Sequence, residues 1–482
     1  MHQFSSNFPF PFHSIMIMQN GKMLMEEYFP PFKKDGLHRM FSITKSFTSL
    51  AVGALVAEGR LNPDDRICDL FPEYMPADAD DRLTGMTVRD MLMMRTCHKA
   101  TTYKTDMTKH WVESFFMTSP DHAPGRIFKY DTSSAHTLAA LVKKISGKGV
   151  LDYLREIYLD AIGFSKDAHI LTDPFGCEIG GSGLVARPSD LLKTAQLLLS
   201  LYNGKFLKEY PELTGDKHDR IFWENYTDYI KEAMSFQSPT LHEGKTIDEM
   251  QGYGYQFWMI RDGGVMMYGM GGQYVVLYPD KELIFITTAD TQSVQGGTQY
   301  ILDEIRWVAM SADVITEGSH PLTHSANITD MASSSSDTHL TFSPSTSGEN
   351  GSGSIFPAAD DVSLMKGYYG SYRLLPNTSG FKKLTLTESE LTLDTDSGHF
   401  VFPYGLNEAA ASKESVYGQQ IYTRAYPQPD DSLYLRVQIL DEYVGCIHIM
   451  MNKENDEITV SLRKVEESLY KEFNCFLGGV RE

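Results

Sequence analysis

The stretch Met40-Phe41-Ser42-Ile43-Thr44-Lys45-Ser46-Phe47 decides the fold of this chain. An extended run ends at Ser42, and the pattern from Ile43 to Glu58 is helical and apolar on most sides. We therefore expect a buried helix over 43–58, with Gly59 as its C-terminal cap. Because residues three apart lie on one face of a helix, Ser42 and Lys45 are expected to meet at its start.

This spacing suits a nucleophile and its base. A serine hydroxyl is a poor nucleophile at neutral pH and needs an adjacent base. Burial lowers the pKa of a lysine, so the neutral amine of Lys45 becomes available to take the proton of Ser42. The N–H groups at the start of the helix also favour the negative charge that develops during attack on a carbonyl.

The S-x-x-K pattern alone has low specificity. Only one of its occurrences stands where an extended run passes into a buried helix, and the others fall in the polar or β-rich C-terminal part. We therefore predict that Ser42 is the nucleophile. The serines that satisfy the pattern are Ser42, Ser363, Ser379, Ser461 and Ser468.

The segments around this helix predict an α+β domain. Two apolar runs flank Asn20-Gly21, which is typical of a tight hairpin over 13–28. Helical patterns dominate the middle of the segment, and a last amphipathic helix is expected over 298–310. Strands at both ends with helices between them indicate one antiparallel sheet built from N- and C-terminal pieces. The later strands are expected at 254–260, 273–278 and 283–287.

The composition changes after this domain. We expect the catalytic domain over 1–314, a Ser-, Thr- and Gly-rich linker over 315–360, and a separate domain over 361–482. The last part contains short runs in which apolar and polar residues alternate, such as Glu390–Asp394. Alternation with a period of two predicts a lipocalin-like antiparallel β-barrel or a β-sandwich.

Charge and cysteine usage limit the function classes. The chain of 482 residues has 43 Lys and Arg against 63 Asp and Glu, a net charge of −20, which disfavours nucleic acid and membrane surfaces as partners. No signal peptide and no apolar run of about 20 residues are apparent. The five cysteines are odd in number and include no C-x-x-C pair, so we expect a cytoplasmic protein without a metal or cofactor.

Several segments, in a fixed order, resemble the serine β-lactamase and penicillin-binding-protein superfamily, and in particular its class C-like branch of esterases and peptidases. The resemblance covers about residues 13–310. It implies a β-lactamase/transpeptidase-like domain, with Tyr130 sharing protons between Ser42 and a leaving group. The matching segments are Phe41–Phe47, Leu55–Leu61, Met86–Leu92, Pro124–Tyr130, and Gly180–Leu184 with Pro188–Leu191.

Two positions depart from the pattern of that superfamily. Thr132 stands where the second motif often has Asn, so a hydroxyl is expected to contact the substrate carbonyl. The third motif resembles a G-x-G-G-Q variant in which Met270 replaces the usual Lys or His. Gly271, Gly272 and Gln273 are expected to line the oxyanion hole, and the missing cation disfavours β-lactams that carry a carboxylate.

These features predict a serine hydrolase that acts on an ester or amide of a small molecule through an acyl-enzyme. Transfer of the acyl group to an alcohol or amine is an alternative with the same first step. A non-catalytic ligand-binding protein on the same scaffold is a second alternative. The departures in the motifs favour it, whereas the complete set of Ser42, Lys45 and Tyr130 disfavours it. Assembly into a homo-oligomer is left open.

Overall fold

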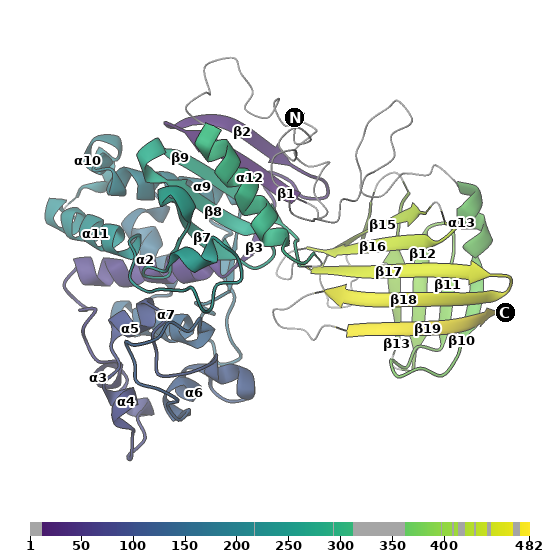
Figure 1. Ribbon diagram of the computed structural model, residues 1–482, viewed down its shortest axis with the longest axis horizontal. Coiled ribbons are helices and arrows are strands. Elements are labelled where there is room, and N and C mark those ends of the chain that lie inside the picture. The colour runs from purple at the N-terminus through teal and green to yellow at the C-terminus, as the bar shows by residue number, and fades with distance from the viewer. Residues whose placement is uncertain are drawn as a thin grey trace, which may run out of the picture. The chain divides into compact units, whose positions relative to one another are not determined.

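The computed structural model describes residues 12–215, 217–292, 294–311, 362–396, 398–406, 409–412, 420–428, 430–440, 445–465 and 473–482. The chain divides into two compact units (Figure 1). The main segment of one unit is Phe12–Leu302, and the main segments of the other are Asp303–Ile439 and Gly445–Glu482. The predicted linker over 315–360 lies outside the described residues, and the predicted domain limits stay predictions.

The first unit contains a six-stranded antiparallel sheet with the order β2-β1-β9-β8-β7-β6. Its first two strands come from the N-terminal end of the unit and the other four from its C-terminal end, which confirms the predicted assembly of one sheet from both pieces. The strands are β1 (Phe12–Gln19), β2 (Lys22–Tyr28), β6 (Trp258–Met259), β7 (Val265–Gly269), β8 (Gln273–Tyr278) and β9 (Leu283–Ala289).

The N-terminal hairpin forms as predicted. Asn20 and Gly21 both have positive φ, 50° and 74°, which is the geometry of the tight turn that Asn-Gly favours. The predicted strand over 254–260 is wrong over most of its length. A β-carbon on Gly254 would lie 2.0 Å from the carbonyl oxygen of Ala233, and Gln256 has a positive φ of 65°. The backbone therefore turns there, and only β6 pairs with the sheet.

Helices cover the sheet and build most of the core. Helix α2 is almost completely buried, packs with α9 against strands of the sheet, and contacts α11. Helix α2 ends one residue earlier than predicted, and Gly59 follows it with a φ of 70°. The helices are α2 (Ile43–Ala57), α3 (Ile67–Leu70), α4 (Asp81–Thr84), α5 (Val88–Leu92), α6 (Trp111–Met117), α7 (Thr132–Ser146), α8 (Val150–Leu154), α9 (Pro188–Tyr202), α10 (Phe206–Glu209), α11 (Arg220–Ala233) and α12 (Gly297–Ser311).

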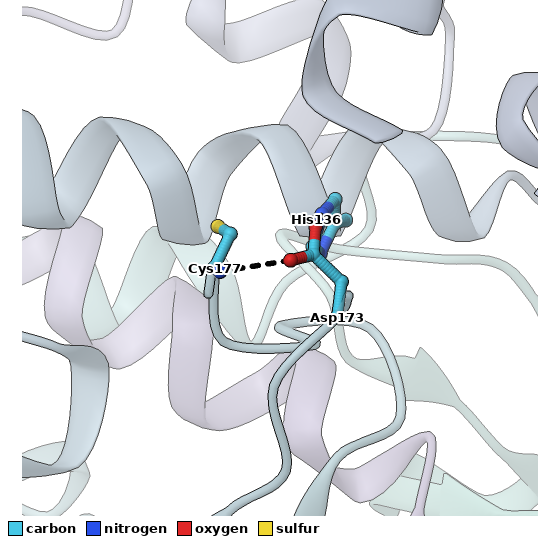
Figure 2. Close-up of side chains that lie close together, drawn as sticks. All are labelled: His136, Asp173 and Cys177. Atoms are coloured by element: carbon cyan, nitrogen blue, oxygen red, sulfur yellow. Dashed lines mark hydrogen bonds and ion pairs between the residues drawn. The ribbon is translucent and has the colours of Figure 1, made fainter. Parts of the chain in front are cut away.

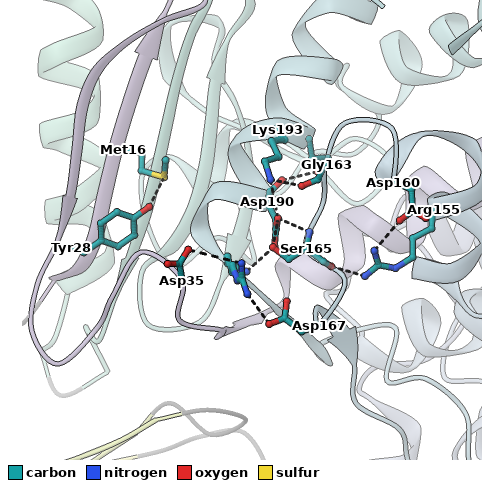
Figure 3. A network of polar contacts seen from close by, with 12 residues as sticks. Met16, Tyr28, Asp35, Arg155, Asp160, Gly163, Ser165, Asp167, Asp190 and Lys193 are labelled. Carbon is teal, nitrogen blue, oxygen red and sulfur yellow. Dashed lines mark hydrogen bonds and ion pairs between the residues drawn. The ribbon is translucent and has the colours of Figure 1, made fainter. Parts of the chain in front are cut away.

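A small three-stranded sheet leads into the buried helix. Its order is β3-β5-β4, and its strands are β3 (His38–Phe41), β4 (His169–Ile170) and β5 (Leu184–Ala186). Asp190 in the first turn of α9 accepts hydrogen bonds from the backbone N–H of Arg187, at 3.1 Å, and of Ser165, at 2.9 Å (Figure 3). The Arg187 guanidinium also pairs with Asp167 at 2.8 Å. These contacts fix the passage from β5 into α9.

The second unit is a ten-stranded antiparallel sheet with a short helix, α13 (Val362–Tyr368). Its edge strands β13 and β14 lie close together, so the sheet is a nearly closed barrel, one of the two predicted architectures. The order is β13-β12-β11-β10-β19-β18-β17-β16-β15-β14. The strands are β10 (Gly370–Leu374), β11 (Lys383–Leu386), β12 (Glu390–Thr395), β13 (Gly398–Pro403), β14 (Ala410–Ser412), β15 (Ile421–Pro427), β16 (Leu433–Ile439), β17 (Gly445–Glu454), β18 (Glu457–Val465) and β19 (Phe473–Arg481).

Strand β15 illustrates how the sequence forms this barrel. Ile421, Thr423 and Ala425 are buried, whereas the residues between them are half-exposed. This alternation places one side of the strand in the core and the other toward the surface. Among the described residues of both units, no helix has the length and apolar character that crossing a membrane requires. The cytoplasmic location stays a prediction.

Candidate active site

Ser42 lies where β3 passes into α2. The preceding residue, Phe41, has a φ of +47°, a left-handed conformation that is uncommon for a residue with a side chain and turns the chain sharply into the helix. Ser42 itself already has a helical backbone, with φ −69° and ψ −5°. Ser42 is half-buried, whereas Phe41 and Ile43 are buried. Of these consecutive residues, Ser42 is thus the one accessible to a ligand.

Lys45 is the buried partner of Ser42. Its Nζ lies 2.9 Å from Ser42 Oγ, 3.3 Å from Thr132 Oγ1 and 2.6 Å from the carbonyl oxygen of Gly181. The side chain is 1% exposed, and burial lowers the pKa of Lys45 to about 7, although the nearby charge of Asp131 acts in the opposite direction. Near neutral pH this amine is therefore able to release and accept a proton.

Tyr130 completes the group that sequence analysis predicted. The Lys45 ammonium lies 4.8 Å from the centre of the Tyr130 ring. Burial raises the pKa of Tyr130 well above its usual range, although a hydrogen bond with the Ser42 side chain opposes the increase. The ring stacks on Trp258, with centroids 5.5 Å apart, and meets Tyr253 edge to face. Tyr130 is therefore a protonated phenol, held by aromatic neighbours beside Ser42.

Thr132 and Gly181 approach Lys45 because the residues around them are small. A β-carbon on Gly181 would lie 2.4 Å from the Thr132 Cγ2 atom, and one on Gly180 would lie 2.2 Å from Ala139 Cβ. Any larger residue would push the segment away from α7. The two glycines were identified only as a motif, and the structure explains their presence: they allow the Gly181 carbonyl to accept a hydrogen bond from Lys45.

The glycine segment after β7 also lies close to Ser42. A β-carbon on Gly269 would lie 2.2 Å from the carbonyl oxygen of Met40, which places the end of β7 against the strand that leads to Ser42. Gly271 and Gly272 have positive φ values of 87° and 95°. Their role in an oxyanion hole stays a prediction, which this proximity supports.

The side chain of Gln273 has another set of contacts. It is completely buried, and its Nε2 donates to the carbonyl oxygens of Met270, at 2.6 Å, and Ala289, at 3.0 Å. Its Oε1 accepts a hydrogen bond of 3.0 Å from the N–H of Ala289. These partners tie β8 to β9 and shape the glycine turn, so we do not include the Gln273 amide among the groups that bind substrate.

Asp131 belongs to the site but was missed by sequence analysis. It caps α7, accepting hydrogen bonds from the Ser133 N–H, at 2.8 Å, and hydroxyl, at 2.5 Å. It is completely buried, and burial raises the pKa of its carboxyl to about 6, against the opposing effect of these bonds and of the Lys45 charge. An Asp directly before a helical run is a capping signal, but its closeness to Lys45 depends on the tertiary structure.

Comparison with known proteins finds a family model and distant relatives for this chain. The model of the family described as Beta-lactamase matches residues 11–303. The chain is 22% identical over 203 residues to 6-aminohexanoate-dimer hydrolase of Paenarthrobacter ureafaciens, covering 39% of this chain and 51% of that protein. It is 24% identical over 200 residues to protein flp of Staphylococcus aureus strain MW2, covering 37% of this chain and 40% of that protein.

A similar fold occurs among solved structures. A provisionally named 6-aminohexanoate-dimer hydrolase from Bacillus anthracis aligns with a TM-score of 0.50 and 18% identity, covering 63% of this chain and 79% of that one. At this identity the likeness concerns the fold alone. The chain spans about half the length of the curated relatives it matches.

Proposed function

This chain belongs to the Beta-lactamase family, and from that premise we propose that it is a serine hydrolase that cleaves an ester or amide of a small molecule through an acyl-enzyme on Ser42. The observation that carries the proposal is the 2.9 Å contact between Lys45 Nζ and Ser42 Oγ, made by a buried lysine whose pKa is lowered to about 7. A buried lysine that served only to stabilise the fold would have no need of a half-exposed serine as its partner.

In the first step, neutral Lys45 takes the proton of the Ser42 hydroxyl while Oγ attacks the substrate carbonyl carbon. The N–H of Ser42 at the start of α2 and the backbone of the glycine segment stabilise the oxyanion. The protonated phenol of Tyr130 donates its proton to the leaving group, and Lys45 returns a proton to Tyr130. The carbon–heteroatom bond breaks, and the acyl group remains on Ser42.

In the second step, water replaces the leaving group. Lys45 accepts a proton from water as it attacks the acyl carbon, and the Ser42 oxygen leaves with a proton that Lys45 gives back directly or through Tyr130. Free acid and the original protonation states are regenerated. An alcohol or amine in place of water would give acyl transfer by the same route.

The surroundings of Ser42 favour a substrate with an apolar or aromatic portion. Tyr130 is partly exposed beside Ser42 and packs against Trp258 and Tyr253, which are themselves buried, so the aromatic surface next to Ser42 comes from Tyr130. Met270, in the turn between β7 and β8, stands where related motifs carry a cation, so this position offers no charge to hold a substrate carboxylate. A relative named as a hydrolase of a 6-aminohexanoate dimer makes linear amides the first candidates, beside simple esters.

The test is steady-state hydrolysis of p-nitrophenyl esters and of linear 6-aminohexanoate amides by wild type, Ser42→Ala and Ser461→Ala. Ser461 also has a lysine three residues later, but it lies on strand β18, so it is a matched control. We expect kcat/KM to fall by about 10³-fold or more in Ser42→Ala and to be unchanged in Ser461→Ala. Turnover that survives in Ser42→Ala would overturn the proposal.

A further inference from the structure

A second group of reactive side chains lies near α7, one helical turn after Thr132. His136 lies in the second turn of α7, and Asp173 and Cys177 lie in the loop between β4 and β5 (Figure 2). One ligand atom from each of the three lies within 4.8 Å of the other two. The His136 Nε2 atom is 3.0 Å from Asp173 Oδ2. No step of the proposed reaction uses these residues.

The Asp173 carboxylate is held in a fixed position. Its Oδ1 accepts hydrogen bonds from the backbone N–H of Phe175, at 2.9 Å, and of Cys177, at 2.8 Å, while Oδ2 faces His136. These three contacts hold the Asp173 carboxylate, which is only 4% exposed, in one orientation toward His136.

The imidazole of His136 has unused binding capacity. Its side chain is completely buried, and its Nδ1 atom has no hydrogen-bond partner among the described residues. Because no acceptor or donor fixes the protonation of Nδ1, the ring is able to carry its proton there, and this leaves the lone pair of Nε2, the nitrogen that faces Asp173, available for a ligand.

We propose that His136, Asp173 and Cys177 form a binding site for a divalent cation of the zinc class. Imidazole nitrogen, carboxylate oxygen and thiolate sulfur are the ligands that zinc prefers, and a tetrahedral ion would keep its fourth position for water. The thiolate and the carboxylate together balance the two positive charges, so the buried site is neutral when the ion is bound.

Binding of the ion requires a small movement of the Cys177 side chain and the release of one proton. In a tetrahedral zinc site the nitrogen and sulfur ligands are about 3.6 Å apart. The sulfur of Cys177 lies within 4.8 Å of the other two ligand atoms, so it has to move inward where its separation exceeds that spacing. Cys177 is half-buried in a loop, where a change of side-chain rotamer supplies this shift. The thiol releases its proton to solvent, and the proton on Nε2 of His136 is replaced by one on Nδ1. One proton is thus released for each ion.

The position of the site suggests what the ion does. Helix α7 begins with Thr132, and the loop that contains Cys177 continues to Gly181. Thr132 and Gly181 both accept hydrogen bonds from Lys45. An ion that joins His136 to Asp173 and Cys177 would fix these two segments relative to each other. It would stabilise the surroundings of Lys45 without touching the substrate.

The experiment titrates the chelator-treated full-length protein with Co²⁺ and follows the thiolate-to-cobalt absorption in the near ultraviolet, then displaces Co²⁺ with Zn²⁺. We expect one ion per chain, with the thiolate absorption. In Cys177→Ser this absorption is lost, and the affinity for Zn²⁺ falls by about 10-fold or more. Asp173→Asn, which keeps the shape of the side chain, is expected to weaken binding without removing the thiolate absorption.

Cys68→Ser is the matched control, because Cys68 is also half-buried but lies in α3. It is expected to bind Co²⁺ as wild type does. Two outcomes would overturn the proposal: a folded wild-type chain that binds no stoichiometric Co²⁺ or Zn²⁺, and thiolate absorption that persists in Cys177→Ser. In either case His136 and Asp173 would be a buried hydrogen-bonded pair that serves the fold alone.

Discussion

Lys45 Nζ lies 2.9 Å from Ser42 Oγ across the first turn of α2, and the same amine donates a 2.6 Å hydrogen bond to the Gly181 carbonyl. The second contact holds the lysine in place, and in the proposed reaction the first contact provides a route for the proton. A flexible lysine would have to be ordered for each attack, whereas this one is ordered before the substrate arrives.

Replacement of Lys45 is expected to abolish most of the activity. Lys45→Met keeps much of the apolar stem but has no base, and Lys45→Arg has a group that stays charged at all accessible pH values. We expect kcat/KM to fall by about 10³-fold in both variants, because the residues of such a unit act together. Near-wild-type rates in Lys45→Arg would show that the lysine is not the base. Unchanged thermal melting would confirm that the loss is not due to unfolding.

The pH dependence follows from the lowered pKa of Lys45. Because the neutral amine is the active form and its pKa is about 7, kcat/KM is expected to rise with pH through about 7 and to level off above it. The charge of Asp131 raises the pKa of Lys45, so Asp131→Asn removes that effect and is expected to move the rise to lower pH. Asn also caps helices well, so α7 is expected to persist. If the rise of kcat/KM in Asp131→Asn stays at the same pH or moves to higher pH, the proposed effect of Asp131 on Lys45 is contradicted.

Tyr130→Phe separates proton transfer from packing. The ring keeps its stacking on Trp258, so the free energy of unfolding is expected to change by less than about 1 kcal/mol. The loss of the hydroxyl removes the acid that serves the leaving group, and kcat for amides is expected to fall by about 10²–10⁴-fold. Esters with a good leaving group depend less on this acid, so their kcat is expected to fall by a smaller factor. Equal losses for both substrate classes would argue against Tyr130 as the acid.

Gly181→Ala tests the close approach of the loop to α7. The added β-carbon would lie 2.4 Å from Thr132 Cγ2, so Thr132 or the Gly181 carbonyl has to move away from Lys45. We expect a loss of about 1–3 kcal/mol in the free energy of unfolding together with reduced kcat. Gly215→Ala is the control, since a β-carbon there has open space around it. Denaturant unfolding and turnover are measured for both; a Gly181→Ala variant that behaves like the control would refute the close-approach argument.

The parts of the fold and site that depend on neighbouring residues were predictable from the sequence. Ser42 and Lys45 lie within one helical turn, and Asn20-Gly21 sets its own hairpin turn. The strand predicted over 254–260 failed because the carbonyl of Ala233 leaves no room beside Gly254, a contact between distant segments.

The same reason explains the site residues that were missed. Asp131 influences Lys45, and Gly181 accepts its hydrogen bond, only because α7 and the loop after β4 fold against α2. The pairing of His136 with Asp173 joins residues 37 positions apart, with no short motif to indicate it. Local patterns predicted Ser42 and Lys45 as nucleophile and base, and tertiary packing determines which groups lie around them.

The most direct test of the account is the intact mass of the chain after treatment with a fluorophosphonate probe, for wild type, Ser42→Ala and Ser461→Ala. We predict one adduct on wild type and on Ser461→Ala, and none on Ser42→Ala, because only Ser42 has a buried lysine amine 2.9 Å from its hydroxyl among the described S-x-x-K serines. A folded wild-type chain that forms no adduct, or an adduct that persists in Ser42→Ala, would contradict the assignment of Ser42 as the nucleophile.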